Sequence, residues 1–310
     1  MYSLISTRLS GGNRINKEPA MYSPVRLAWK YLHYYFTAAN GKGHGIHSPF
    51  VFDFVTRVLN DRGPYPAWTA IEEMRGRLLR DERVLRIEDM GAGSVYARGA
   101  ADAVAGSPAD TAARIEGVGT KMRTGSVRKI SDIARRAAKP RRLGQLLFRI
   151  AHHYQPATVL ELGTSLGLST AYLATGAPGA RVISIEGSGE IIETAAENLN
   201  SLGLTPELIQ GNFDVLLEPL LGRIGPVELA FVDGNHRCEP TLQYFHLLMA
   251  HVRGPAVLIF DDIHWSAEME KAWTAIRADP RVYMTIDLFF IGLIFLRDEF
   301  KVKQDFTIRF

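Results

Sequence analysis

The sequence predicts an α/β protein with a doubly wound, mostly parallel sheet of seven strands. Residues 143–278 alternate five times between short segments rich in Val, Ile and Leu and longer segments with apolar residues at helical spacing. Such alternation is typical of βα units, whose parallel sheet is covered by helices on both faces. Two further apolar segments, 282–290 and 292–298, follow each other with only a tight link. They predict a terminal antiparallel pair at the sheet edge.

Each expected strand is a short apolar run that ends at glycine or at an acidic residue. The five parallel strands are expected at 158–163, 181–186, 206–211, 227–234 and 256–262. The helices between them are expected at 168–176, 189–202, 213–222, 238–252 and 266–278. An amphipathic helix from residue 143 precedes the first strand.

The first part of the chain has a different composition. Residues 1–143 hold 24 Lys and Arg against 13 Asp and Glu, whereas residues 144–310 hold 12 against 20. We therefore divide the chain into a mainly helical, basic accessory or lid region, 1–142, and a second domain, 143–310. Helices are expected near 25–39, 48–61, 66–80 and 128–138, with Ser48 and Pro49 at the start of the second.

Much of the positive charge lies in the basic run at 121–142, which has nine Lys and Arg and a single acidic residue, Asp132. Such a run could contact nucleic acid, a phosphorylated substrate or the acidic second half of the chain. A solvated or intramolecularly paired face is the interpretation that we favour.

The overall composition is that of a soluble globular protein, with 46% hydrophobic and 22% charged residues. Its most apolar segment, 286–296, is too short to span a bilayer, so we expect a cytoplasmic protein and no membrane partner. The single cysteine, Cys238, excludes an internal disulfide and a multi-cysteine metal site.

Two segments, 83–94 and 157–170, each read as an apolar strand that runs through an acidic residue into a glycine-rich turn. Only the second is followed by a helix and another strand, which ends in Glu186, 25 positions after Glu161. A nucleotide-type loop needs that second strand, because it brings an acidic residue to the ribose hydroxyls, typically about 20 positions on. We therefore predict the cofactor loop at 157–170. The first segment is assigned as a turn of the accessory region, which either covers the acceptor pocket together with 41–50 or has no contact with the site.

The glycine spacing of the second loop is G-x-x-x-G, without the G-x-G-x-x-G that a pyrophosphate requires. Glu161 lies two positions before Gly163 and would repel a pyrophosphate, but it suits a cationic ligand. This spacing disfavours an NAD-dependent oxidoreductase and favours S-adenosyl-L-methionine, which carries a sulfonium and an ammonium group.

The pattern E-x-G-x-x-x-G-x-S, the acid at the end of the next strand and the final antiparallel pair together resemble class I S-adenosylmethionine-dependent methyltransferases. The resemblance implies a Rossmann-like fold. It also implies a set of cofactor-binding residues: Glu161, Gly163, Thr164, Gly167, Ser169, Glu186, Asn212 and Asp233.

The segments "FVDGNH" and "IFDDIHW" resemble the metal-dependent O-methyltransferase branch that includes catechol O-methyltransferase. This resemblance implies that Asp233, Asp261 and Asp262 bind Mg²⁺ or another divalent cation, although that branch usually has Asn at the position of Asp262. His236 lies where that branch has its catalytic Lys. We predict Asp233 and His236 as catalytic residues, with His236 as the general base.

These features predict an S-adenosylmethionine-dependent transferase that O-methylates a small hydroxylated molecule, with or without a divalent metal. Two alternatives stay open: a nucleic-acid methyltransferase that uses the basic N-terminal region, and a cofactor-binding protein without catalysis. A homodimer is compatible with the sequence.

Overall fold

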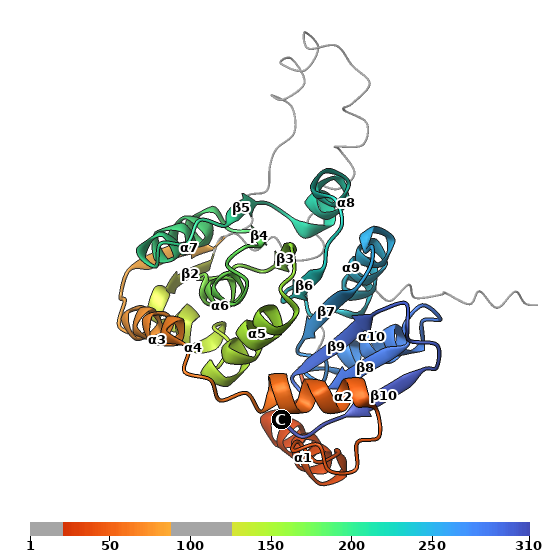
Figure 1. Ribbon diagram of the computed structural model, residues 1–310. Helices are drawn as coiled ribbons and strands as arrows, with labels where there is room; N and C mark the ends of the chain where they lie inside the picture. The colour runs from red at the N-terminus through yellow and green to blue at the C-terminus, as the bar shows by residue number, and fades with distance from the viewer. Residues whose placement is uncertain (1–20, 88–125) are drawn as a thin grey trace, which may run out of the picture.

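The computed structural model describes residues 21–87 and 126–310. Its main sheet has eight strands in the order β10-β8-β9-β7-β6-β3-β4-β5, with helices on both faces (Figure 1). The strands are β3 (Thr158–Leu162), β4 (Arg181–Glu186), β5 (Glu207–Gln210), β6 (Leu229–Val232), β7 (Ala256–Asp261), β8 (Met284–Asp287), β9 (Ile291–Leu296) and β10 (Gln304–Thr307). The predicted doubly wound α/β class is confirmed.

The helices follow the predicted alternation closely. Those around the main βα units are α5 (Arg141–Tyr154), α6 (Leu168–Gly176), α7 (Gly189–Ser201), α8 (Phe213–Ile224), α9 (Cys238–His251) and α10 (Ala267–Ala278). The N-terminal part contains α1 (Pro24–Thr37), α2 (Pro49–Phe54), the π-helical turn η1 (Val55–Leu59), α3 (Pro66–Leu78) and α4 (Ile130–Arg136). No helix in the described ranges is long and apolar enough to cross a membrane.

The sheet differs from the prediction at one edge. Strand β9 is antiparallel to both β7 and β8, as expected for the terminal pair, but it lies between them. Strand β10 then adds to β8 in parallel and forms the edge, so the sheet has eight strands rather than seven. The sequence did not indicate β10 because this strand is only four residues long and three of them, Gln304, Asp305 and Thr307, are polar.

Alternate residues of the central strands pack into different layers, as the pleat of a strand requires. Val159 of β3 packs with α2, η1 and α5 on one face. Leu160 and Leu162 of the same strand pack with α8, α9 and α10 on the other face. Burial of both faces explains why these strands are almost uniformly apolar.

The N-terminal helices pack directly on the main sheet. Buried residues of α2 and η1 share one core with α5 and with Phe295 of β9. Helix α1 packs through Tyr34 and Ala38 against Phe289. The predicted division between residues 142 and 143 falls inside α5; that division stays a prediction.

The first glycine-rich segment begins as a strand outside the main sheet. Strand β1 (Val84–Ile87) pairs only with β2 (Ser126–Lys129), in antiparallel register, as a separate two-stranded sheet. Residues 88–94 of that segment lie outside the described residues. Strand β2 lies within the basic run, where no strand was predicted, because four exposed residues give no apolar alternation to detect.

Candidate active site

The acidic residues singled out in the sequence gather at the carboxyl ends of β3, β4, β6 and β7. Strand β3 is flanked by β4 on one side and by β6 on the other, so the strand order reverses at β3. Open α/β sheets bind ligands in the crevice at such a reversal. The fold therefore brings Glu161, Glu186, Asp233 and Asp261 to the edge where a ligand is expected.

The loop after β3 approaches the end of β6 so closely that only glycine fits at its start. Gly163 has φ +108, and a Cβ atom there would lie 2.1 Å from the carbonyl oxygen of Asp233. The Asp233 N–H donates to the Leu162 carbonyl at 2.8 Å. Gly167, with φ +84, precedes the first turn of α6. The two predicted glycines thus fix the loop against Asp233 and direct α6 away from it.

Glu161 is fully buried beneath this loop. Its Oε2 accepts hydrogen bonds from Thr170 Oγ1 at 2.5 Å and from Ser184 Oγ at 2.6 Å. Its Oε1 is buried and has no hydrogen-bond partner among the described residues. Burial raises the pKa of Glu161 to about 7, although the hydroxyl groups of Ser169, Ser184 and Thr170 oppose the shift. Glu161 therefore supports the loop from below and keeps one oxygen unpaired.

Glu186 at the end of β4 holds the same loop from the side. Its Oε2 accepts from the Ser165 N–H at 2.9 Å, and its Oε1 accepts from the Ser188 N–H at 3.1 Å. Burial raises its pKa. Asn212 caps α8 by accepting from the Asp214 N–H at 2.8 Å. Both residues lie at strand or helix ends, as predicted, and their contact with a cofactor stays a prediction.

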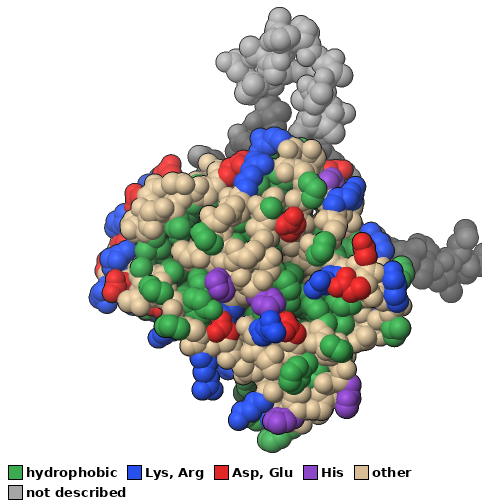
Figure 2. Space-filling model, viewed as in Figure 1, with side chains coloured by type: hydrophobic (Ala, Val, Ile, Leu, Met, Phe, Trp, Pro, Cys, Tyr) green, Lys and Arg blue, Asp and Glu red, His purple; other side chains and the backbone are tan. Residues whose placement is uncertain are grey.

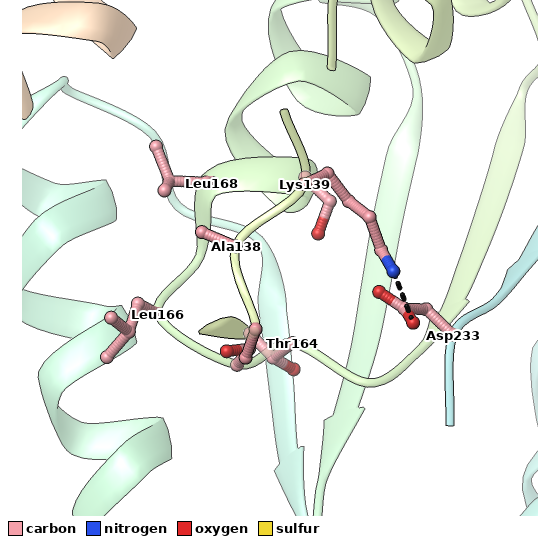
Figure 3. A pocket seen from close by; sticks show the side chains of 9 residues that line it. Ala138, Lys139, Thr164, Leu166, Leu168 and Asp233 are labelled. Carbon is pink, nitrogen blue, oxygen red and sulfur yellow. Dashed lines mark ion pairs between the residues drawn. The ribbon is translucent and has the colours of Figure 1, made fainter. Parts of the chain in front are cut away.

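The structure adds one residue that the sequence analysis did not assign to the site, Lys139. Its Nζ lies 2.9 Å from Asp233 Oδ1 (Figure 3). It also forms an ion pair with Asp261 Oδ2. Only 13% of the Lys139 side chain is exposed, against 12% for Asp233 and 1% for Asp261. Burial alone would lower the pKa of Lys139, but the charges of the neighbouring aspartates outweigh burial and raise it.

The same lysine lines a small pocket between the basic run and the cofactor loop. The pocket is formed by residues 137–139 on one side and by residues 164–169 on the other, with Asp233 at its end (Figure 3). Thr164 and Ser169, both predicted cofactor-binding residues, belong to this lining. The segment between α4 and α5 therefore lies across the predicted cofactor loop.

The basic run had three open alternatives, and its described ion pairs favour one of them. Lys139 pairs with acidic residues of the second half of the chain, Lys129 with Glu82 and Arg135 with Asp132. Intramolecular pairing is therefore what the structure shows for these three residues. The sequence shows only that Lys139 directly precedes Pro140 and the helix that leads into β3. Its contact with aspartates about a hundred positions away leaves no pattern in the sequence, so the sequence could not place Lys139 in the site.

The predicted metal ligands lie close together, but two of them, Asp233 and Asp261, already form ion pairs with Lys139. One oxygen or nitrogen atom from each of Asp233, His236 and Asp261 lies within 4.8 Å of the others. Asp262, whose φ is +55, has its Oδ2 4.0 Å from His236 Nε2. Carboxylate oxygens and imidazole nitrogen have the donor chemistry for a divalent cation. The Lys139 ammonium group, however, lies on two of these carboxylates, and the metal role of the three aspartates stays a prediction.

His236 lies at the rim of this cluster, with Nε2 3.5 Å from Asp233 Oδ1. Burial lowers its pKa, and the charge of Asp233 opposes that shift. A neutral imidazole has an unprotonated ring nitrogen, which a general base requires. His264, by contrast, is held between Glu270 at 3.0 Å and Asp287 at 2.9 Å. His236 is thus the histidine that the fold brings to the aspartates.

Comparison with known proteins agrees with the fold. Residues 160–263 match a family model described as a methyltransferase domain. The chain is 33% identical to a catechol O-methyltransferase of Mycobacterium tuberculosis over 123 residues, which are 39% of this chain and 54% of the relative. It is 27% identical to a catechol O-methyltransferase of Niastella koreensis over 124 residues, 39% of this chain and 55% of the relative. The chain thus spans about half the length of these curated relatives.

Among solved structures, an S-adenosylhomocysteine-bound methyltransferase of Podospora anserina aligns with a TM-score of 0.50 and 16% identity, over 81% of this chain and 97% of that chain. This alignment shows a shared fold. Sheet order, glycine loop and family match together define a class I methyltransferase domain. Within that class, the two curated relatives that this domain resembles are catechol O-methyltransferases.

Proposed function

We propose that this protein transfers a methyl group from S-adenosyl-L-methionine to a hydroxyl oxygen of a small molecule. The observation that carries the proposal is the cluster of Asp233, Asp261, Asp262 and His236 beside the glycine loop. The names of the two bacterial relatives, both catechol O-methyltransferases, support a hydroxylated aromatic acceptor.

The loop chemistry supports the cofactor. Glu161 and Glu186 place two carboxyl groups against the loop, which disfavours a pyrophosphate and favours a sulfonium and an ammonium group. Glu186, at the end of the strand after the loop, is the proposed partner of the ribose hydroxyls. Thr164, Gly167 and Ser169 would face the cofactor from the loop, and Asn212 from the start of α8.

The reaction requires an acceptor oxygen aligned with the methyl carbon and a group that takes the hydroxyl proton. The oxygen lone pair forms the new C–O bond while the C–S bond breaks, and its electrons stay on sulfur. His236, kept neutral by its lowered pKa, would accept the proton, and Asp233 would orient the imidazole. Holding the two reactants in one small pocket supplies much of the remaining acceleration.

Methyl transfer from labelled S-adenosyl-L-methionine to a panel of catechols, other phenols, aliphatic alcohols, RNA and DNA tests the proposal. We expect labelled product with hydroxylated aromatics and none with nucleic acid. Label on RNA or DNA alone, or on no acceptor despite cofactor binding, would contradict it in favour of one of the two alternatives.

The cofactor assignment has its own test in the affinity for S-adenosylhomocysteine, measured by calorimetry. Glu186→Gln should weaken binding about tenfold, because a charged acceptor of hydrogen bonds becomes neutral. Glu193→Gln, an exposed substitution on α7, is the matched control and should bind as the wild type does. Equal affinities for both variants would remove Glu186 from the cofactor site.

The nucleic-acid alternative receives little support from the described surface. The basic residues of β2 and α4 are paired in part with acidic neighbours. Over the described residues on the face shown in Figure 2, Lys and Arg side chains are interspersed with Asp and Glu. Salt-sensitive binding to RNA or DNA would be the measurement that favours this alternative.

A further inference from the structure

The ammonium group of Lys139 lies among the carboxylates that the family resemblance assigns to a metal. It contacts Asp233 Oδ1 at 2.9 Å and Asp261 Oδ2 directly. These two residues, with His236, are the ones whose ligand atoms lie within 4.8 Å of one another. A protein-bound cation and the predicted metal would therefore use the same oxygen atoms.

The backbone that carries Lys139 leads directly into a packed helix. Pro140 follows it directly and caps α5, in which Leu143, Leu146 and Leu147 are buried. Gly144, one turn into α5, lies so close to α6 that a Cβ atom would be 2.4 Å from the Tyr172 ring. On its other side, residues 137–139 line the pocket against the cofactor loop. The lysine is therefore anchored in the site by the packing of α5 on α6.

Within the described part of the chain, the carboxylates of this cluster have one positively charged side chain among them, that of Lys139. Asp233, Asp261 and Asp262 supply three carboxylates in a largely buried position, and Lys139 is the basic residue in direct contact with two of them. A divalent ion at 2.0–2.6 Å from the same oxygens would stand next to the ammonium group, and the two cations would repel each other at short range. Binding of the metal would require the Lys139 side chain to leave, with the loss of its ion pairs to Asp233 and Asp261.

We propose that Lys139 is the resident cation of this acidic cluster and stands in place of the divalent metal of the related enzymes. The lysine holds Asp233 and Asp261 in position and leaves the cluster without affinity for a metal. This inference rests on the proposed function only in placing the methyl acceptor beside these carboxylates. Whether Lys139 or a metal ion lies among them does not depend on methyl transfer.

Titration of the full chain with Mn²⁺, after dialysis against a chelator, tests the proposal by calorimetry. We expect no saturable site in the wild type. Lys139→Met should bind one Mn²⁺ at least about tenfold more tightly than the wild type, because three hard ligands are then free of their cation. Lys129→Met is the matched control, since it removes a lysine of the same basic run, and it should behave as the wild type does.

Thermal unfolding gives a second readout that does not depend on methyl transfer. Mn²⁺ should raise the melting temperature of Lys139→Met and leave that of the wild type unchanged, because a ligand of the folded state stabilises that state. Asp261→Asn added to Lys139→Met should abolish the shift. If Lys139→Met fails to fold, Lys139→Gln replaces it, since glutamine keeps hydrogen-bond donors without the charge.

Saturable Mn²⁺ binding by the wild type that is as tight as that of Lys139→Met, and that Asp261→Asn abolishes, would overturn the proposal. A failure of the proposed function would look different. The protein would then transfer no methyl group to any acceptor, while the Mn²⁺ titrations of the wild type and of Lys139→Met would still differ.

Discussion

Two lysines of the same basic run form ion pairs in very different surroundings. Lys129 of β2 pairs with Glu82 at 2.6 Å, with 52% and 63% of the two side chains exposed. Lys139, ten positions later, pairs with Asp233 and Asp261, and none of the three side chains is more than 13% exposed. The comparison teaches that the sequence alone does not reveal how much a charged residue contributes to stability. Burial determines how much stability is lost when one partner of an ion pair is removed.

The largest effect is expected from removal of the buried cation. Lys139→Met should lower the free energy of unfolding by about 3–5 kcal/mol near neutral pH, since it leaves buried carboxylates without a partner. Urea unfolding monitored by circular dichroism would measure this difference. A loss no greater than that of Lys129→Met would show that solvent reaches the cluster and that the two pairs are equivalent.

The cost of losing Lys139 should also depend on pH. Burial raises the pKa of Asp233 to about 6 and that of Asp261 to about 7, while Lys139 opposes both shifts. A raised pKa in the folded state means that the protonated form is favoured there, so stability is gained as the pH falls through these values and lost as it rises. Without Lys139 both pKa values rise further, and the penalty of Lys139→Met should shrink from about pH 8 to about pH 5.

The wild type is the necessary reference in that pH series. Asp262, whose pKa burial also raises, and His236, whose pKa burial lowers, titrate in the same cluster with opposite signs. Subtracting the free energy of unfolding of the wild type at each pH removes much of the pH dependence that Asp262 and His236 contribute independently of Lys139. A penalty that is constant across the series would mean that the aspartates stay charged throughout.

An intermediate effect is expected at His264, which lies between two acids on a half-buried part of the surface. Burial lowers its pKa, but the hydrogen bonds and charges of Asp287 and Glu270 outweigh burial and raise it. Stability from the protonated ring is therefore fully present below the ordinary histidine pKa and is lost as the pH rises through the folded value.

His264→Gln should cost on the order of 1–2 kcal/mol at low pH and less at high pH, because hydrogen bonds to a charged group are replaced by neutral ones. Urea unfolding at both ends of the range would measure it. A cost that grows with pH would show that the neutral ring, and not the imidazolium, is the stabilising form.

The smallest effect is expected at the exposed pair. Lys129→Met should leave the free energy of unfolding unchanged within error, since exposed ion pairs gain little and salt screens them. Unfolding in low and in high salt would check this. A measurable loss of unfolding free energy that persists in high salt would show that the exposed pair stabilises the fold in the way expected of the buried pair.

The sequence predicted most of the methyltransferase sheet because its strands are apolar on both faces and its helices have regular apolar spacing. Strand β3 and helix α6, for example, appear at the predicted positions. Strand β1 lies within the segment that was read as a strand, whereas β2 and β10 were missed, because each is short, lacks a fully buried residue and is mainly polar. Whether a short, exposed segment forms a strand depends more on the strand it pairs with than on its own hydrophobic pattern.

The candidate site was predictable where it depends on strand ends and not where it depends on distant contacts. Glu186, Asp233 and Asp261 all follow apolar strands, and parallel strands bring their carboxyl ends to one edge. Lys139 follows no strand, and its position depends on how α5 packs on α6. The sequence therefore located the acids of the cluster and missed the cation among them.

The start of α5 at Arg141 has a practical consequence for anyone who wishes to express the methyltransferase domain alone. A fragment cut at residue 143, where the composition changes, would retain the cofactor loop and all three aspartates. It would begin inside a helix and lack Lys139, so its acidic cluster would carry only negative charge. A fragment that keeps Lys139 beside these aspartates has to begin before residue 139, within what composition alone assigns to the other region.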